Sequence, residues 1–235
     1  MVMIEITSFG SGSGGNAYRV TDGVTPLLLE AGIKYREIQK GFDFRLTEVA
    51  GCLLTHEHGD HSKSIKDIMK AGINVYTSPG TIKTLGISGH RLKPVKAMQQ
   101  FQLGSWTILP FDTEHDVSEP LGFLLANQDG EKLLFATDTY YIRYKFKGLT
   151  HIMVECNYST GILNQNILDG RIPQVMRKRL LQSHFSLENV KEFFKANDLS
   201  KVQEIWLLHL SDTNSDAAMF KEEIMKLTGK MVVIP

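Results

Sequence analysis

The sequence predicts a mixed α/β protein of the α+β kind, a four-layer αβ/βα sandwich in which two sheets pack face to face beneath outer helices. In the first half, short apolar or alternating runs are separated by Gly, Asp-Gly and Pro, as strands are. Helical spacing of apolar residues appears mainly late in the chain. Because several strand-like runs are apolar throughout, they need cover on both faces, and this layering supplies it.

The first half is expected to start as an antiparallel meander and to continue with a buried strand and a helix. Strands are predicted at residues 4–7, 17–20, 27–30 and 51–55. Residues 62–71 place Ile65, Ile68 and Met69 on one side of a helix, and Gly72 provides a C-terminal stop.

The second half is expected to add strands first and helices afterwards. Strands are predicted at residues 101–111, 121–126, 132–137, 152–155 and 204–208. Ser186 and Ser215 are each placed to cap a helix. The apolar residues at helical spacing behind them are Leu187, Val190, Phe193 and Phe194, and then Ala217, Phe220, Ile224 and Leu227.

The composition fits one globular domain spanning residues 1–235, since 42% of the residues are hydrophobic and 22% are charged. The 26 basic and 26 acidic residues cancel, so the net charge implies no global attraction to nucleic acid or membrane. The first ten residues have no basic start, which argues against a secretory signal, and no run is long enough to span a membrane. Cys52 and Cys156 are too few for a disulfide framework. We therefore expect a cytoplasmic protein with no membrane contact; the residues predict no oligomeric state.

The segment THEHGDH at residues 55–61 carries three imidazoles and two carboxylates directly after an apolar strand. Imidazole and carboxylate are ligands suited to zinc, iron and manganese, and an irregular turn can aim neighbouring side chains at two closely spaced ions. A solvated polar turn is the weaker interpretation, because ordinary turns are built from Gly, Asn, Asp and Ser.

The His-X-His-X-Asp-His pattern within this segment resembles the signature of the metallo-β-lactamase superfamily. The later ligands of that family have counterparts here in the same order, each at the end of an apolar run: His115, Asp138 and His209. The resemblance implies a four-layer sandwich of the metallo-β-lactamase type and two divalent metal ions, Zn²⁺ or Mn²⁺, with iron also suitable. It implies that one ion is held by His56, His58 and His115, the other by Asp60, His61 and His209, and that Asp138 bridges them. His90 and His151 lack such a setting and are interpreted as structural.

One position departs from the family pattern. The early strand usually ends in Asp near a Gly, whereas this chain has Glu30-Ala31-Gly32. We expect the longer carboxylate of Glu30 to orient the ligand loop through hydrogen bonds.

The sequence is most similar to one branch of this family, the YycJ/WalJ-like proteins. The similar segments are SFGSGSGGN at residues 8–16, HDVSEPLGF at 115–123, ATDT at 136–139 and LHLS at 208–211. Members of the branch are regarded as exonucleases or other nucleic-acid phosphodiesterases, and small versions occur in phage recombination modules. The resemblance implies a nucleic-acid substrate.

Further residues are expected to act on substrate. By resemblance to related tRNA 3′-processing enzymes, His184 paired with Glu155 assists proton transfer to the leaving oxygen, and a structural role for His184 at a helix entry stays open. Ser11 and Gly12, in the glycine-rich segment, and Ser211 are expected to contact substrate. The glycines also match Gly-X-Gly-X-X-Gly, but an alternating strand follows them instead of a helix, so dinucleotide binding is rejected in favour of a hairpin turn, and a purely structural turn stays open.

We expect a dinuclear-metal-dependent hydrolase, most simply a phosphodiesterase acting on nucleic acid like a DNA exonuclease, with a metal-bridging hydroxide as nucleophile. Asp60 is expected to ligate one metal and to orient that hydroxide. The alternative is a small-molecule hydrolase for a lactone, thioester or cyclic nucleotide with the same centre. A non-catalytic binding module would require loss of the ligand set, which is intact.

A basic run near Arg177 is interpreted equally well as a phosphate contact or a solvated helix face.

Overall fold

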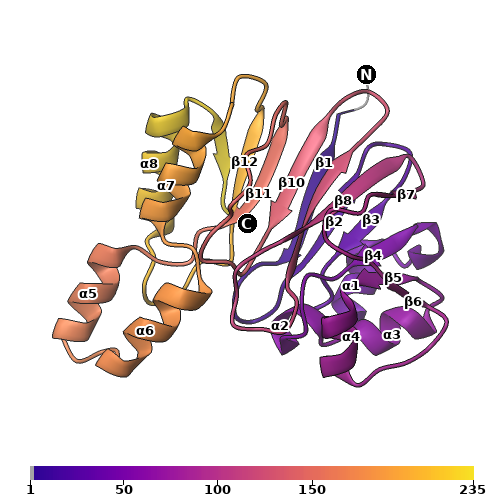
Figure 1. The fold of residues 1–235 in the computed structure, drawn as a ribbon, viewed down its shortest axis with the longest axis horizontal. Helices are drawn as coiled ribbons and strands as arrows, with labels where there is room; N and C mark the ends of the chain where they lie inside the picture. The colour runs from indigo at the N-terminus through magenta and orange to yellow at the C-terminus, as the bar shows by residue number, and fades with distance from the viewer. Residues whose placement is uncertain (1–2) are drawn as a thin grey trace. The chain divides into compact units, whose positions relative to one another are not determined.

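The computed structural model describes residues 3–235 and divides into two compact units (Figure 1). Unit 1 comprises Met1–Asp112 and Val117–Lys132, and unit 2 comprises Thr113–Asp116 and Leu133–Pro235. Residues 1 and 2, which the expected domain 1–235 includes, lie outside the described part of the chain.

Unit 1 contains a mixed sheet that begins as the predicted meander. Its strands, in spatial order, are β1 (Glu5–Gly10), β2 (Ala17–Thr21), β3 (Leu27–Leu29), β4 (Gly51–Leu53), β5 (Val75–Thr77) and β6 (Leu92–Pro94). The first three strands pair antiparallel, and the remaining pairs are parallel. The helical segments are α1 (Tyr35–Gly41), the 3-10 helix η1 (Leu46–Glu48), α2 (Gly59–Ser62), α3 (Ile65–Lys70) and α4 (Pro79–Leu85). Ile38 of α1 and Ile68 of α3 are buried in one apolar cluster with Leu28 and Cys52 of the sheet.

The predicted strand at residues 101–111 is wrong as a single element. It is a hairpin of β7 (Phe101–Leu103) and β8 (Trp106–Asp112), and β8 pairs antiparallel with β9 (Leu121–Ala126). The turn contains Gly104, whose φ of +59° favours glycine and where a Cβ would lie 2.4 Å from Thr25. Trp106 Nε1 donates to the Thr25 carbonyl at 2.9 Å and fixes the return strand.

Unit 2 is a parallel sheet with helices, and its strands confirm the three predicted at residues 132–137, 152–155 and 204–208. The strands are β10 (Lys132–Ala136), β11 (His151–Glu155), β12 (Glu204–Leu208) and β13 (Met231–Val233), each parallel to the next. The helices are α5 (Thr160–Leu168), α6 (Gln174–Ser183), α7 (Leu187–Ala196) and α8 (Ala217–Thr228). Since the carboxyl ends of parallel strands share one edge, this topology brings together Asp138 after β10, Glu155 at the end of β11 and His209 after β12.

The two predicted helix caps have different outcomes. Ser186 is confirmed, because its side chain accepts a hydrogen bond from Asn189 N at the start of α7. Ser215 is wrong: the neighbouring Asp216 caps α8 by accepting from Met219 N, while the Ser215 hydroxyl donates to the Ser211 carbonyl at 2.6 Å.

The predicted helix at residues 62–71 is confirmed over α3, but it begins at Ile65 and not at Ser62, which ends the separate α2. Ser64, between the two helices, bonds elsewhere: its hydroxyl donates to the Ile33 carbonyl at 2.5 Å and its N–H to the Ala31 carbonyl at 2.8 Å. Elements α1, α4, α5, α6, β5, β6 and β13 were not predicted, since they are short or carry few apolar residues.

Across residues 3–235, the helices are all too short or too polar to traverse a lipid bilayer. Both cysteines are free and buried, Cys52 within β4 and Cys156 directly after β11. Burial raises the pKa of both thiols well above the ordinary value, so both are held as neutral apolar side chains.

Candidate functional site

The THEHGDH segment of unit 1 forms a fixed loop between β4 and α2. Its last part is held by Ser62, whose hydroxyl donates to the carbonyls of Glu57 at 2.8 Å and His58 at 3.0 Å. His58 is the N-cap residue of α2, and its carbonyl accepts from the His61 N–H at 3.0 Å. His56 and His61 are buried despite their polarity. A loop fixed in this way can hold side chains in one geometry for a ligand.

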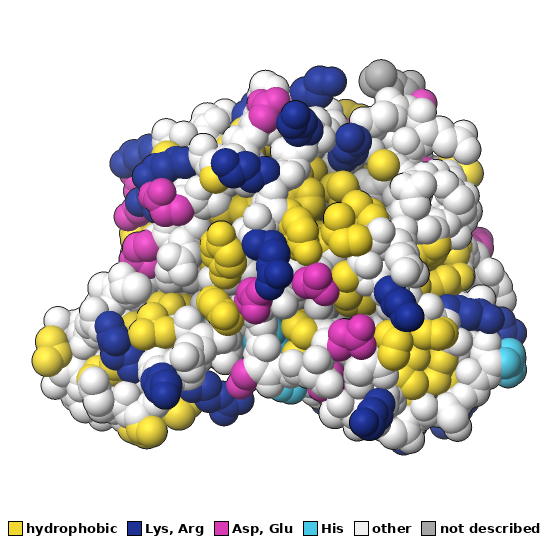
Figure 2. Space-filling view, in the orientation of Figure 1, with side chains coloured by type: hydrophobic (Ala, Val, Ile, Leu, Met, Phe, Trp, Pro, Cys, Tyr) yellow, Lys and Arg dark blue, Asp and Glu magenta, His cyan; other side chains and the backbone are white. Residues whose placement is uncertain are grey.

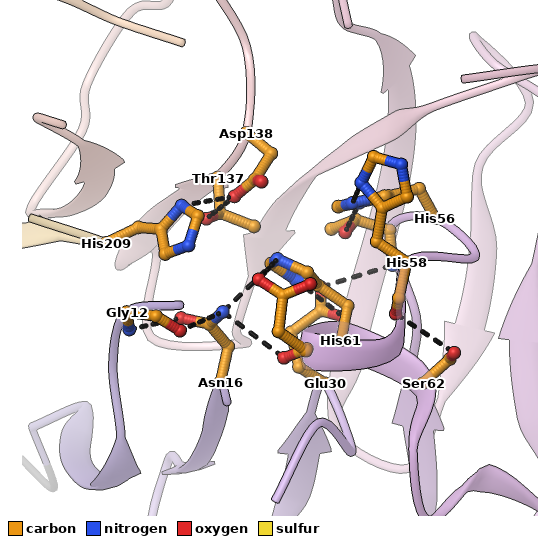
Figure 3. A network of polar contacts seen from close by, with 12 residues as sticks. Gly12, Asn16, Glu30, His56, His58, His61, Ser62, Thr137, Asp138 and His209 are labelled. Atoms are coloured by element: carbon orange, nitrogen blue, oxygen red, sulfur yellow. Dashed lines mark hydrogen bonds and ion pairs between the residues drawn. The ribbon is translucent and has the colours of Figure 1, made fainter. Parts of the chain in front are cut away.

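The imidazoles of this loop converge (Figure 3). His56 Nε2 lies 3.2 Å from His58 Nδ1, and the ring centroids of His56 and His61 are 4.2 Å apart. Thr55 Oγ1, 2.9 Å from His56 Nδ1, holds the other ring nitrogen of His56. Buried ring nitrogens gathered in this way are the donor set that zinc and related ions prefer.

Glu30 reaches the loop from the end of β3 and supports it as predicted. Its Oε1 accepts from Thr55 N at 3.2 Å, and its Oε2 lies 3.5 Å from His61 Nδ1; both side chains are 0% exposed. Burial raises the pKa of Glu30, and the neighbouring His61 partly offsets this. Glu30 has a φ of +62°, in the left-handed region that residues other than glycine rarely adopt. The surrounding structure must therefore hold it in this conformation.

Asn16 is a residue whose importance the sequence interpretation missed. Its N–H donates to the Asp60 carbonyl at 2.7 Å, its Nδ2 lies 3.2 Å from His61 Nε2, and its Oδ1 accepts from Gly12 N at 3.0 Å. Gly32 packs against the same carbonyl, where a Cβ would lie 1.6 Å from Asp60 O. The glycine-rich turn therefore supports the ligand loop, and the sequence signal for this role was Asn16, which follows the last glycine of the turn.

In unit 2, Glu155 is surrounded by donors from three separate segments. Its Oε2 accepts from the backbone N–H groups of Thr139 at 2.9 Å and Phe185 at 3.0 Å. Its Oε1 lies 2.6 Å from His184 Nδ1 and 3.2 Å from His209 Nδ1. Since the carboxylate is fully buried and both oxygens are engaged, it is suited to organising these segments.

Glu155 and His184 each favour the charged form of the other. Burial alone would raise the pKa of Glu155, but the adjacent His184 holds it below the ordinary value. Burial alone would lower the pKa of His184, and Glu155 raises it instead. The His184 side chain is 20% exposed, so its imidazole is paired on one side and accessible to solvent.

Asp138 and His209 are held in an uncommon backbone conformation after the carboxyl ends of β10 and β12, the two strands that flank β11. Their φ angles are +42° and +53°, and His209 Nδ1 lies 2.8 Å from Asp138 Oδ1 (Figure 3). Thr137 Oγ1 donates to the same Asp138 oxygen at 2.9 Å, and Asn157 Nδ2 donates to the His209 carbonyl at 2.8 Å. Strain of this kind persists where surrounding bonds fix it, and it is common at functional sites.

His115 is oriented by the end of α6. Its Nδ1 donates to the Ser183 carbonyl at 2.8 Å, which places the ring proton on Nδ1 because a carbonyl only accepts. Its Nε2 is then a lone-pair donor, 3.8 Å from Asp138 Oδ2. Burial lowers the pKa of His115 and keeps the ring neutral, as metal ligation requires.

Unit 2 also offers a second grouping of donors. One ligand atom each from Asp138, Glu155, His184 and His209 lie within 4.8 Å of one another, a spacing that a metal ion could use. Both Glu155 oxygens already accept hydrogen bonds, so Glu155 and His184 are better suited to a supporting role, and the roles of Asp138 and His209 as ligands stay a prediction.

The remaining predicted residues lie in ordinary settings. Ser211 Oγ accepts from Asn214 N at 3.2 Å in the turn after β12, and Ser11 Oγ accepts from Tyr18 OH at 2.9 Å. His90 is exposed, and His151 lies at the start of β11, the opposite end from Glu155. Contact of Ser11, Gly12 and Ser211 with substrate stays a prediction.

Comparison with protein-family models decides the family. The model described as "Beta-lactamase superfamily domain" matches residues 27–198. The chain belongs to the β-lactamase superfamily. It is 26% identical over 230 residues to exodeoxyribonuclease YycJ of Bacillus anthracis, covering 90% of this chain and 84% of that one. It is 25% identical over 221 residues to exodeoxyribonuclease WalJ of Streptococcus pneumoniae, covering 87% and 81%.

The fold is likewise that of known superfamily members. The metallo-β-lactamase fold protein YhfI of Bacillus subtilis superposes with a TM-score of 0.73 at 16% identity, covering 99% of this chain and 95% of that one. The predicted fold class and superfamily are therefore confirmed, and the predicted branch agrees with the similarity to YycJ and WalJ. The chain is a metal-dependent hydrolase, its fold implies divalent metal ions, and its His/Asp groups are able to bind them.

Proposed function

We propose that this β-lactamase superfamily protein is a dinuclear phosphodiesterase that hydrolyses nucleic acid, most simply as a DNA exonuclease. The observation that carries the proposal is the pairing of the buried Glu155 with the partly exposed His184 beside Asp138 and His209, an acid–base group next to candidate ligands. The names of the YycJ and WalJ relatives support the substrate class.

Two sets of residues would hold the ions. They are His56, His58 and His115 for one ion and Asp60, His61 and His209 for the other, with Asp138 shared by both sets. The donor chemistry fits, because the side chains of His56 and His115 are buried and His115 presents an unprotonated Nε2. Zn²⁺ and Mn²⁺ are the expected ions, and iron suits the same donors. Such ions would supply an activated water and stabilise charge on the phosphoryl oxygens.

Other steps of the proposed reaction are assigned to individual side chains. Asp60, whose side chain is 25% exposed, orients the attacking water. His184, protonated through its pairing with Glu155, donates a proton to the leaving oxygen. Ser211 Oγ accepts from neighbouring N–H groups, and a hydroxyl can still donate to a phosphate oxygen. Ser11 and Gly12 are the other proposed substrate contacts.

Attraction of an anionic substrate must be local. The net charge is zero, and on the face drawn in Figure 2 the Lys and Arg side chains are interspersed with Asp and Glu. Electrostatic stabilisation in a fixed site requires no basic protein overall. A cytoplasmic location is part of the proposal, and the free, buried Cys52 and Cys156 support a reducing compartment.

The test is hydrolysis of end-labelled single- and double-stranded DNA and RNA by protein reconstituted with zinc or with manganese. We expect labelled mononucleotides or short products from at least one nucleic acid. His58→Ala is the inactive control, and His90→Ala, an exposed histidine outside the proposed site, is the matched active control. Efficient turnover of lactones, thioesters or cyclic nucleotides with every nucleic acid inert would establish the small-molecule alternative instead.

A further inference from the structure

Unit 2 contains a cavity of about 430 Å³ that the metal site does not use. A volume of this size lies within the range of pockets that hold small organic ligands. One wall is the segment 140–145, and the other comes from Phe185 and α7. The lining residues are Tyr140, Tyr141, Ile142, Arg143, Tyr144, Lys145, Phe185, Asn189, Glu192, Phe193, Ala196 and Asn197.

Glu155 is hydrogen-bonded to the backbone at the beginning of both walls of the cavity. Its Oε2 accepts from Thr139 N, immediately before the first wall, and from Phe185 N, the first residue of the second. Thr139 Oγ1 also donates to the Tyr141 carbonyl at 2.8 Å, which fixes the turn into the first wall. The carboxylate that pairs with His184 therefore also determines where the cavity begins, within a few residues of the proposed proton donor.

The chemistry of the lining is that of a base-binding pocket. Phe185 and Phe193 are buried and supply apolar surface, whereas Tyr141 is 55% exposed and presents a ring to solvent. Arg143 and Lys145 are exposed cations in the same wall, and of the lining residues named above only Glu192 is acidic. Arg143 pairs with Glu114, and the five N–H donors of a guanidinium allow it to contact a phosphate as well. Aromatic rings beside cations are the combination that binds single-stranded nucleic acid.

We propose that this cavity binds a nucleobase of the substrate strand, stacked on Tyr141, with Arg143 and Lys145 contacting the adjoining phosphate. The proposal rests on the proposed function, since it names the part of a nucleic acid that lies next to the reacting phosphate. It requires that the bound nucleotide be unpaired, because a base within a duplex has no free face to stack on the ring.

The first test is binding, which needs neither metal nor turnover. Thymidine 5′-monophosphate and the base-free deoxyribose 5-phosphate are titrated into the metal-free protein by calorimetry. We expect the nucleotide to bind more tightly than the base-free sugar phosphate, and Tyr141→Ala to weaken nucleotide binding on the order of tenfold, as for loss of one stacked base. Tyr141→Phe, which keeps the ring, restores binding. Phe44→Ala, which removes a ring 67% exposed in unit 1, is the matched control.

The second test uses oligonucleotides with a normal or an abasic terminal nucleotide. We expect Tyr141→Ala to lower kcat/KM on the order of tenfold on the normal strand, and its penalty to shrink to less than about threefold on the abasic strand. Equal penalties on both strands, or nucleotide binding that is the same in wild type and Tyr141→Ala, would overturn the assignment even if the protein degrades DNA. If nucleotide binding depends on Tyr141 but the protein degrades no nucleic acid, the cavity is a nucleobase site and the proposed nuclease activity is wrong.

Discussion

Glu155 Oε1 lies 2.6 Å from His184 Nδ1, while Oε2 of the same carboxylate is held by two backbone N–H groups. The pair is therefore positioned by the backbone of unit 2 and not only by its own attraction. A rigidly held carboxylate fixes both the orientation of the imidazole and its protonation, which is what a proton donor requires.

His184→Ala is expected to retain the metal content of the wild type and to lose on the order of a hundredfold or more in rate on nucleic acid, as for removal of a general acid. The loss should be smaller on a nitrophenyl phosphodiester, whose leaving group departs without a proton. Metal analysis and kinetics on both substrates check this. Equal losses on both, or a metal-depleted variant, would show that His184 is instead a ligand with Asp138 and His209.

The titration of His184 provides a test with a defined sign. Because Glu155 raises the pKa of His184, the imidazole should stay protonated above the ordinary value of about 6.5 and lose its proton only as pH rises through the raised value. Glu155→Gln removes the charge, so the midpoint should move to lower pH. NMR of the metal-free protein, with His184→Ala to assign the signal, measures both midpoints. An unchanged midpoint would contradict the pairing.

Glu30→Gln is expected to weaken metal affinity about 10- to 100-fold while the chain stays folded. The glutamine oxygen can still accept from Thr55 N, but its amide would present N–H donors towards His61 Nδ1, where a carboxylate oxygen now lies 3.5 Å away. Competition with a chelator measures the affinity, and circular dichroism monitors the fold. Affinity equal to that of the wild type would mean that the carboxylate at this position does not support the ligand loop.

Metal analysis of protein purified without chelator should find more than one equivalent of transition metal per chain. His58→Ala and Asp138→Ala should each abolish turnover and stay folded, since neither side chain belongs to the apolar core. His90→Ala should match the wild type in metal content. A maximum of one ion after reconstitution with zinc and with manganese would defeat the dinuclear proposal.

Asn157→Ala is expected to lower the free energy of unfolding by about 1–3 kcal/mol, because it leaves the His209 carbonyl without the side-chain donor that now lies at 2.8 Å. Denaturant unfolding measures the loss. Asn164→Ala, at an exposed position of α5, should stay within about 0.5 kcal/mol of the wild type. A similar change in both variants would indicate that Asn157 does not stabilise the backbone of His209.

The sequence by itself determined the kind of chemistry and much of the fold. Dense histidines at residues 55–61 are a local signal, and the apolar runs before Asp138 and His209 mark strand ends, so the ligands and their strands were predicted without coordinates. The break in the helix at Ser64 and the hairpin at Gly104 were missed because their causes lie elsewhere in the chain, at Ile33 and Thr25.

Only the tertiary structure decided which segments form hydrogen bonds with the supporting residues Glu155 and Asn16. Thr139 reaches Glu155 because β10 pairs with β11, whereas Phe185 and His184 reach it because the segment between α6 and α7 returns to the end of β11, and no local pattern encodes either contact. The same holds for Asn16, whose contact with the Asp60 carbonyl joins segments far apart in sequence. Local propensity and periodicity depend on neighbouring residues, whereas burial and hydrogen bonding at a strand edge depend on which segments the fold brings together.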